Sequence, residues 1–331
     1  MSQDFLLHSP MKKVFATLTL LVLSIHFCGA QNVSRFEVEK TFVWKKDTLS
    51  GTLLSKGKKI SKIHKLPIVL FISGSGPTDR DGNSKMAQGP NNSFSQLADS
   101  LLKHGIASYR YDKLGVGKSQ YSGDEEDMRF GNNVEVALNA VKKLQDLGFK
   151  KIFIAGHSQG SLVGMLAAQK GDVDGFISME GSAANAFDLM SEQLNKVLPE
   201  PMRASTIRKL DSIKNGYTVT SYSPMLASLL RKSLQPYLVS YFSYTPTEEI
   251  TKLNIPVLII QGGRDLQTTT KEGENLRDAS TQYDYLFYEN MNHVLKQVDE
   301  SQQQNLAAYS DPDFPLPKTL ANDLAAWINS H

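Results

Sequence analysis

The chain has 331 residues, which is enough for one large α/β domain or two small ones. Its formal net charge is +2, and its 36 Lys and Arg residues are spread along the sequence without a basic stripe. This excludes the charge pattern typical of nucleic-acid binding and indicates no charged partner.

The first 30 residues have the pattern of a secretory signal peptide. Residues 11–13 form a positive n-region, an apolar run of 14 residues covers 14–27, and residues 28–30 place small side chains before a cleavage site. As a helix the run would be about 21 Å long, too short for a hydrocarbon core of about 30 Å. We therefore expect cleavage after Ala30, export to the periplasm or the medium, and no stable membrane anchor. A membrane anchor and lipidation at Cys28 are the alternatives.

Cleavage after Ala30 would remove Cys28, the single cysteine of the sequence. The mature chain, 31–331, would then have no thiol. This excludes a cysteine nucleophile and a thiolate metal site.

The remaining sequence predicts alternating strands and helices. A hairpin is expected at 35–43 and 48–55. Further strands follow at 68–72, 106–111, 151–155, 175–179, 255–261 and 283–288. Amphipathic helices are expected between them, with apolar stripes that begin at Phe94 and Val134, and a last helix carries Leu320 and Ile328. Strands that are apolar on both faces and alternate with helices predict a doubly wound, mostly parallel sheet.

The alternation breaks between residues 181 and 249. This stretch is helical in pattern, with Phe187, Met190, Leu194 and Val197 on one predicted face, and it is rich in Met and Tyr. We interpret it as an inserted helical cap. Its composition suits an apolar acyl or alkyl group, although ordinary helix packing explains most of these residues equally well.

The segment Gly156-His157-Ser158-Gln159-Gly160 reads G-x-S-x-G. An apolar strand leads into it and a helical pattern leads out, which is the context of a nucleophile elbow. The alternative interpretation is a serine-containing turn that begins a helix. In this context we predict that Ser158 is a nucleophile.

A serine hydroxyl needs a base to accept its proton and a carboxylate to orient that base. His293 follows the last predicted strand, at the sheet edge where doubly wound proteins bind ligands. Asp265 follows the strand before it. The alternative role of Asp265 is a helix N-cap, and Glu180 is the rival acid. The predicted triad, Ser158, Asp265 and His293, has the chain order of α/β-hydrolases.

The tetrahedral intermediate of acyl transfer also needs donors for its oxyanion. The backbone N–H of Gln159 is one candidate. The second should come from the glycine-rich loop after strand 68–72, and we favour the N–H of Ser75, with Gly76 next. This loop lacks the Lys-Ser/Thr of a P-loop, and its glycines do not fit G-x-G-x-x-G.

At these motifs the chain resembles the α/β-hydrolase superfamily, over about 36–180 and 250–330. The resemblance rests on the loop 73–83, the segment 110–119, the elbow 156–160 and the loops of Asp265 and His293. It implies the α/β-hydrolase fold.

The run Gly74-Ser75-Gly76-Pro77, followed by Asp79-Arg80-Asp81-Gly82, resembles exported bacterial serine esterases related to dienelactone hydrolases and to serine aminopeptidase-like hydrolases. Ser73 stands where many relatives have His. Ser158 stands where dienelactone hydrolases proper have Cys, which argues against a dienelactone substrate. Asp79, Arg80 and Asp81 could brace the loop or line the pocket.

The resemblance implies hydrolysis of carboxylic esters with a short to medium acyl chain, through an acyl-enzyme and without a cofactor or metal. The expected partner is a small-molecule ester. Two alternatives stay open: a peptidase or thioesterase on the same triad, with Glu248 and Glu249 as weak candidates to hold an α-amino group, and a non-catalytic binding protein that keeps the fold.

Overall fold

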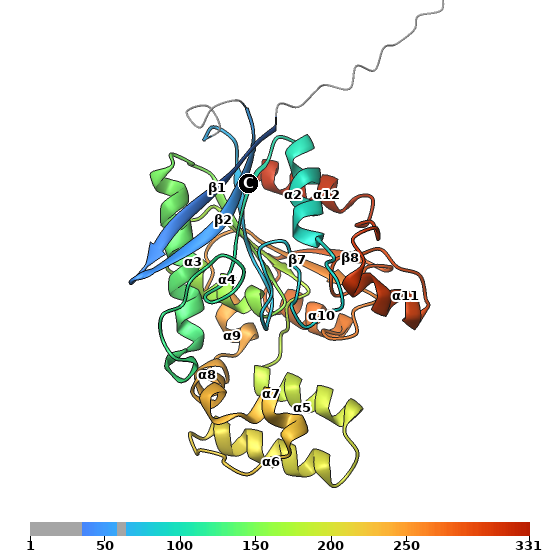
Figure 1. Cartoon of the computed structure of the whole chain (residues 1–331). Helices are drawn as coiled ribbons and strands as arrows, with labels where there is room; N and C mark the ends of the chain where they lie inside the picture. The colour runs from blue at the N-terminus through green and yellow to red at the C-terminus, as the bar shows by residue number, and fades with distance from the viewer. Residues whose placement is uncertain (1–34, 58–63) are drawn as a thin grey trace, which may run out of the picture. The chain divides into compact units, whose positions relative to one another are not determined.

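A computed structural model describes residues 35–57 and 64–331 (Figure 1). The predicted signal segment, 1–30, lies outside these residues. No helix in the described part of the chain is long and apolar enough to cross a membrane.

The described strands form one mixed sheet with the order β1-β2-β4-β3-β5-β6-β7-β8. Neighbours from β4 to β8 pair in parallel, whereas β1–β2 and β2–β4 pair antiparallel. The predicted doubly wound, mostly parallel sheet is therefore confirmed. The strands are β1 Arg35–Trp44, β2 Asp47–Lys56, β3 Ile68–Ile72, β4 Ala107–Tyr111, β5 Ile152–His157, β6 Gly175–Met179, β7 Val257–Gly262 and β8 Asp284–Tyr288.

The four helices with predicted apolar stripes, α2, α3, α5 and α12, lie where the sequence predicts them. The α-helices are α2 Ser93–Lys103, α3 Phe130–Asp146, α4 Gln159–Ala168, α5 Ala186–Val197, α6 Met202–Lys214, α7 Ala227–Leu230, α8 Gln235–Tyr241, α9 Pro246–Ile250, α10 Thr270–Asp278, α11 Gln302–Ala307 and α12 Leu320–Ser330. Short 3-10 turns occur at Glu125–Asp127, Pro224–Leu226, Lys232–Leu234 and Ala308–Ser310.

Side chains of the central strands alternate between two hydrophobic clusters, one on each face of the sheet. In β3, Ile68, Leu70 and Ile72 belong to the cluster that includes α3 and α4. Val69 and Phe71 belong to the cluster that includes α2 and α12. Because successive side chains of a strand point to opposite faces, a strand covered on both sides must be apolar throughout, as the sequence of β3 is.

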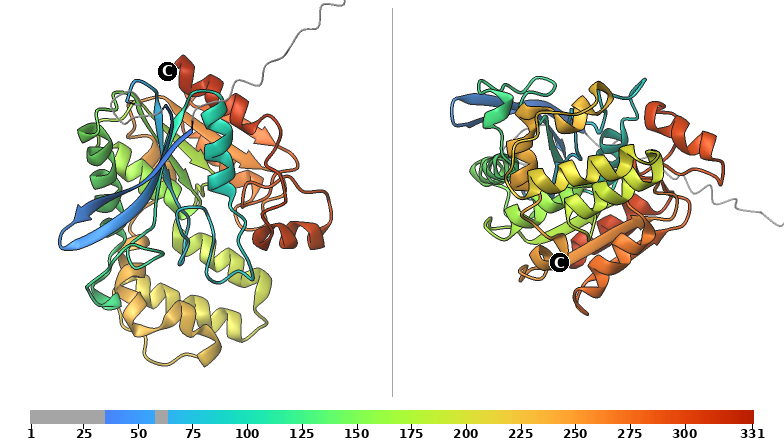
Figure 2. Two further views of the ribbon diagram at one scale, coloured as in Figure 1. Left: turned by 45° about the horizontal axis from the view of Figure 1, so that its top comes forward. Right: turned by 90° about the horizontal axis from the view of Figure 1, so that it is seen from below.

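The segment between β6 and β7 contains α5 to α9 (Figure 2). Phe187, Met190 and Leu194 of α5 pack against the core. Val197, the last residue of α5, is 71% exposed. Cavity-lining residues from α5 and α8 lie beside Ser158, which places these helices over the carboxyl end of β5.

Candidate active site

Ser158 lies at a sharp turn between β5 and α4. Its backbone has φ 53° and ψ −123°, a conformation that costs a non-glycine residue free energy. The amide of Ser158 donates to the carbonyl of Met179 at 2.9 Å, which holds the turn against the end of β6. The structure thus presents Ser158 where a nucleophile elbow presents its serine.

The two glycines of the elbow are required by close backbone contacts. A Cβ at Gly156 would overlap the carbonyl group of Gly160, and a Cβ at Gly160 would overlap the carbonyl of Ile72 at the end of β3. Only glycine lets the strand, the turn and the helix approach this closely.

Asp265 and His293 lie together at the carboxyl ends of β7 and β8. Asp265 Oδ2 and His293 Nδ1 are 2.6 Å apart, and both side chains are buried. Asp265 Oδ1 accepts from the backbone amides of Gln267 and Thr268 at 2.6 and 2.8 Å. Burial opposes ionisation of the Asp265 carboxyl. The charge of His293 and the hydrogen bonds to this carboxyl outweigh burial and hold the pKa of Asp265 below its ordinary value. Asp265 is therefore an anion that holds the proton of His293 on Nδ1 and leaves Nε2 free to act as a base.

Ser158 and His293 line the same cavity. Within the described residues, no hydrogen bond joins Ser158 Oγ to the ring of His293. Catalytic hydrogen bonds are often long in proteins without substrate and tighten in the complex. The three predicted triad residues thus lie at one site, and Asp265 is already paired with His293.

Glu180, the rival acid, lies behind Asp265 rather than beside His293. It is fully buried, and its Oε2 accepts from Gln261 Nε2 at 2.7 Å. Burial and then the proximity of Asp265 raise the pKa of Glu180 well above its ordinary value. Of these two neighbouring carboxyl groups, Glu180 therefore holds a proton more readily than Asp265 does.

The elbow residue His157 contributes a contact that sequence reasoning missed. Its buried ring donates from Nε2 to the backbone carbonyl of His293 at 2.6 Å and lies edge-on to Phe94 of α2. His157 therefore joins the serine turn to the loop that carries the base. Its position beside the predicted nucleophile was the available signal, but the partner 136 residues away could not be read from spacing.

Burial and then the neighbouring His293 lower the pKa of His157 to about 3. A histidine in the unfolded chain has a pKa of about 6.5. At pH values between the folded and the unfolded pKa, only the unfolded chain therefore binds a proton at His157. Stability should therefore fall as pH decreases through this window, by about 2 kcal/mol at pH 5 for this group alone. We expect His157→Gln, whose amide can still donate to the His293 carbonyl, to lose less stability than the wild type between pH 7 and 5. Urea unfolding at both pH values measures this, and equal losses would contradict the assignment.

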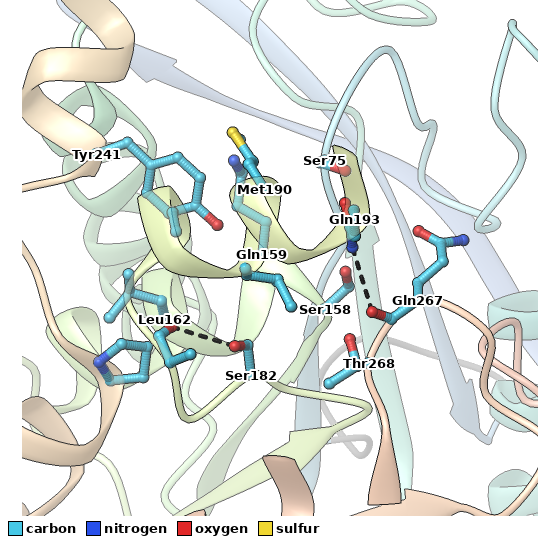
Figure 3. Close-up of a pocket in the computed structure, with 14 residues that line it drawn as sticks. Ser75, Ser158, Gln159, Leu162, Ser182, Met190, Gln193, Tyr241, Gln267 and Thr268 are labelled. Atoms are coloured by element: carbon cyan, nitrogen blue, oxygen red, sulfur yellow. Dashed lines mark hydrogen bonds between the residues drawn. The ribbon is translucent and has the colours of Figure 1, made fainter. Parts of the chain in front are cut away.

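The two predicted oxyanion donors flank Ser158. Gln159 is the first residue of α4, so its N–H has no acceptor within the helix. Gln159 and Ser75 both line the cavity beside Ser158 (Figure 3).

Lys113 orients the glycine-rich loop that carries Ser75. Its ammonium group donates to the carbonyl of Gly76 at 2.6 Å and to the carbonyl of Gly74. Because the N–H and C=O of a trans peptide point in opposite directions, the Ser75 N–H points away from Lys113. Lys113 thus sets the direction of one candidate oxyanion donor, a role that the sequence did not reveal.

The segment Asp79-Arg80-Asp81 braces this loop. Arg80 Nη2 pairs with Asp112 Oδ2 at 2.7 Å, and Arg110 Nε pairs with Asp81 Oδ1 at 3.0 Å. Asp79 Oδ1 accepts from the amides of Asp81 and Asn83, both at 2.9 Å. The structure therefore favours the bracing role among the two that the sequence allowed.

Helix α11, which the sequence analysis did not predict, supports the loops of the acid and the base. Its Asn305 donates from Nδ2 to the carbonyl of Arg264 at 2.7 Å and accepts at Oδ1 from Asn292 at 3.2 Å. Ser301 caps the helix through a bond from Gln304 N. This cap was the one signal in the sequence, because the six residues of α11 have no long apolar stripe.

Two cavities meet at Ser158. The inner cavity has a volume of about 100 Å³, and its lining combines apolar side chains, among them Leu162, Leu189 and Met190, with polar ones, among them Ser182, Gln193 and Thr268. The outer pocket has a volume of about 900 Å³ and extends from His293 along the loops 74–91 and 294–310. Neither Glu248 nor Glu249 lines the inner cavity or the outer pocket.

Residues 35–57 and 64–331 contain no group of three or more His, Cys, Asp or Glu side chains that could hold a metal ion.

Residues 67–296 match the family described as alpha/beta hydrolase fold, which is more than half of the chain. The chain belongs to the α/β-hydrolase fold family. The chain is 27% identical over 280 residues to the esterase EstD of Thermotoga maritima. The match covers 79% of this chain and 62% of EstD, so the hydrolase spans less than two thirds of that relative.

Solved structures of esterases share the fold of this α/β-hydrolase at low identity. Est1E from Butyrivibrio proteoclasticus has a TM-score of 0.55 at 15% identity, over 88% of this chain and 99% of Est1E. A second structure of Est1E, with bound ferulic acid, has a TM-score of 0.53 at 19% identity, over 82% and 96%. The Pyrococcus furiosus esterase Pf2001 has a TM-score of 0.53 at 15% identity, over 90% and 91%. These likenesses show the common fold.

Proposed function

We propose that this α/β-hydrolase is an exported serine esterase that hydrolyses carboxylic esters through an acyl-enzyme, within the group related to dienelactone and serine aminopeptidase-like hydrolases. One observation carries the proposal: a serine at a strained elbow lines the same cavity as a histidine that is paired with an ionised aspartate. Distant homology to esterases supports the same reaction.

The geometry suggests the following steps. Ser158 Oγ attacks the ester carbonyl carbon while His293 Nε2 takes its proton, and the N–H groups of Gln159 and Ser75 donate to the oxyanion that forms. The tetrahedral intermediate collapses as the bond from carbon to the alcohol oxygen breaks, and His293 gives its proton to that oxygen. Water then repeats the sequence on the acyl-enzyme and releases the acid.

A peptidase is the second candidate, on the same triad. An aminopeptidase needs an anion near Ser158 to hold the substrate's α-amino group, and the sequence offers Glu248 and Glu249 as candidates. Glu249 is buried at α9 and pairs with Lys252 at 2.8 Å, and neither acid lines the inner cavity or the outer pocket. The ester reaction is therefore favoured.

A comparison of 4-nitrophenyl acetate with alanine 4-nitroanilide tests the proposal. We expect kcat/KM for the ester to exceed that for the anilide by at least about 10²-fold, after correction for the uncatalysed rates, because no group near Ser158 would hold the α-ammonium. Faster cleavage of the anilide would contradict the esterase assignment. The absence of turnover with both substrates would favour a non-catalytic binding protein.

A further inference from the structure

The inner cavity and the outer pocket share Ser75, Ser158 and Gln267. A hydrogen bond from Gln193 Nε2 of α5 to the carbonyl of Gln267, 3.2 Å long, lies beside Ser158 (Figure 3). In an ester whose carbonyl carbon lies at Ser158, the acyl group and the alcohol would therefore lie on opposite sides of this contact.

Only one of the two spaces contains the proton donor. His293 and His157 line the outer pocket, and the described residues around the inner cavity include no histidine. When the tetrahedral intermediate collapses, the electron pair of the breaking C–O bond stays on the alcohol oxygen, which takes the proton of His293. The alcohol must therefore lie in the outer pocket, and the acyl group is left with the inner cavity.

The inner cavity is small, and apolar side chains such as Leu162, Leu189 and Met190 line it together with polar ones such as Ser182, Gln193 and Thr268. A water occupies about 30 Å³ of liquid, so about 100 Å³ offers room for an acyl chain of about two to four carbons. Leu189 and Met190 of α5 and Tyr241 of α8 are among the larger side chains that line it. A longer chain would have to displace these side chains.

The outer pocket is large and uncharged. Its volume is about ninefold that of the inner cavity. Among the described residues that line it, none is Asp, Glu, Lys or Arg, and its hydrogen-bonding side chains are neutral: Ser84, Gln88, Asn91, Gln303 and Tyr309. A charged alcohol would lose hydration here without gaining a counter-charge. A neutral alcohol with several hydrogen-bonding groups would find partners.

We propose that the enzyme hydrolyses esters of a short acyl group, acetyl to butyryl, with a larger uncharged alcohol. In this orientation the acyl group occupies the inner cavity and the alcohol occupies the outer pocket. The inference rests on the proposed esterase function and adds the orientation of the substrate.

Two isomeric esters test the orientation directly. Heptyl acetate and methyl octanoate have the same atoms and carry the long chain on opposite sides of the carbonyl. We expect kcat/KM for heptyl acetate to be at least about tenfold higher, each rate being referred to hydroxide-catalysed hydrolysis of the same ester, since a chain that does not fit a pocket loses about this factor or more. Equal rates, or faster methyl octanoate hydrolysis, would overturn the assignment.

A variant of the inner wall gives a second measurement. Met190→Ala enlarges the inner cavity and should raise the rate of methyl octanoate relative to heptyl acetate by about fivefold or more. Met225→Ala, at a cap side chain that is 64% exposed and lines neither space, is the matched control and should leave the ratio unchanged. An unchanged ratio in a folded Met190→Ala protein would place the acyl chain elsewhere.

Charge on the alcohol gives the third measurement. Methyl 4-acetoxybenzoate should be hydrolysed at least about fivefold faster than 4-acetoxybenzoate, because the carboxylate would be desolvated without a cation. A preference for the anion would overturn the uncharged-alcohol half of the proposal. Turnover of 4-nitrophenyl acetate without turnover of heptyl acetate would overturn the proposal that the alcohol is large. Absence of turnover with every ester, together with a Ser158 that a fluorophosphonate probe does not label, would refute the esterase function itself.

Discussion

Ser158→Ala should lower kcat/KM for 4-nitrophenyl acetate by at least about 10⁴-fold, equivalent to about 5.5 kcal/mol of transition-state stabilisation. Without Oγ no acyl-enzyme can form, and the remaining rate comes from the oxyanion donors and substrate binding. The fold should persist, because alanine tolerates φ 53° about as well as serine does. Steady-state kinetics with far-UV circular dichroism measures both.

Two serines provide matched controls for this variant. Ser182 lines the inner cavity but lies away from the elbow, and Ser310 lines the outer pocket. Ser182→Ala and Ser310→Ala should each stay within about tenfold of the wild type. If Ser158→Ala fell in the same range, the nucleophile would have to be another group.

Asp265→Asn should lower kcat by about 10³- to 10⁴-fold with little change in KM. The amide cannot hold the proton of His293 on Nδ1 as an anion does, so the ring can adopt the tautomer whose Nε2 cannot act as a base. Glu300→Gln, at an acid whose side chain is 88% exposed, is the matched acid-to-amide control and should be silent.

A variant of Glu180 tests whether Asp265 or Glu180 is the catalytic carboxylate. Since the raised pKa of Glu180 favours its neutral form, Glu180→Gln imitates that form and should lower kcat by less than about tenfold. A larger loss for Glu180→Gln than for Asp265→Asn would assign the catalytic carboxylate to Glu180.

The sequence predicted most of the sheet because several central strands, such as β3, are apolar on both faces. β3 and β6 have the expected limits, 68–72 and 175–179, and the other strands differ by one or two residues. The antiparallel pairing of β2 with β4 was not predicted, since pairing partners far apart in the sequence leave no local pattern. The short helix α11 was missed because six residues carry too little periodicity.

The site residues could be predicted from their order along the chain. The contacts that position them became evident only in the structure. Ser158, Asp265 and His293 could be proposed because each follows a predicted strand. The contacts of His157 with the His293 carbonyl, of Lys113 with Gly74 and Gly76, and of Arg80 with Asp112 join segments that lie far apart in the chain. Such contacts depend on tertiary geometry, so neither composition nor spacing indicates them.

The most direct test is to locate a covalent label. The protein would be treated with a fluorophosphonate probe, digested with trypsin and analysed by mass spectrometry. We expect a single phosphonyl adduct on Ser158, within the peptide 152–170, and no adduct in Ser158→Ala or after heat denaturation of the wild type. A folded wild-type protein that stays unlabelled, or that carries the adduct on another residue, would contradict the assignment of Ser158 as the nucleophile.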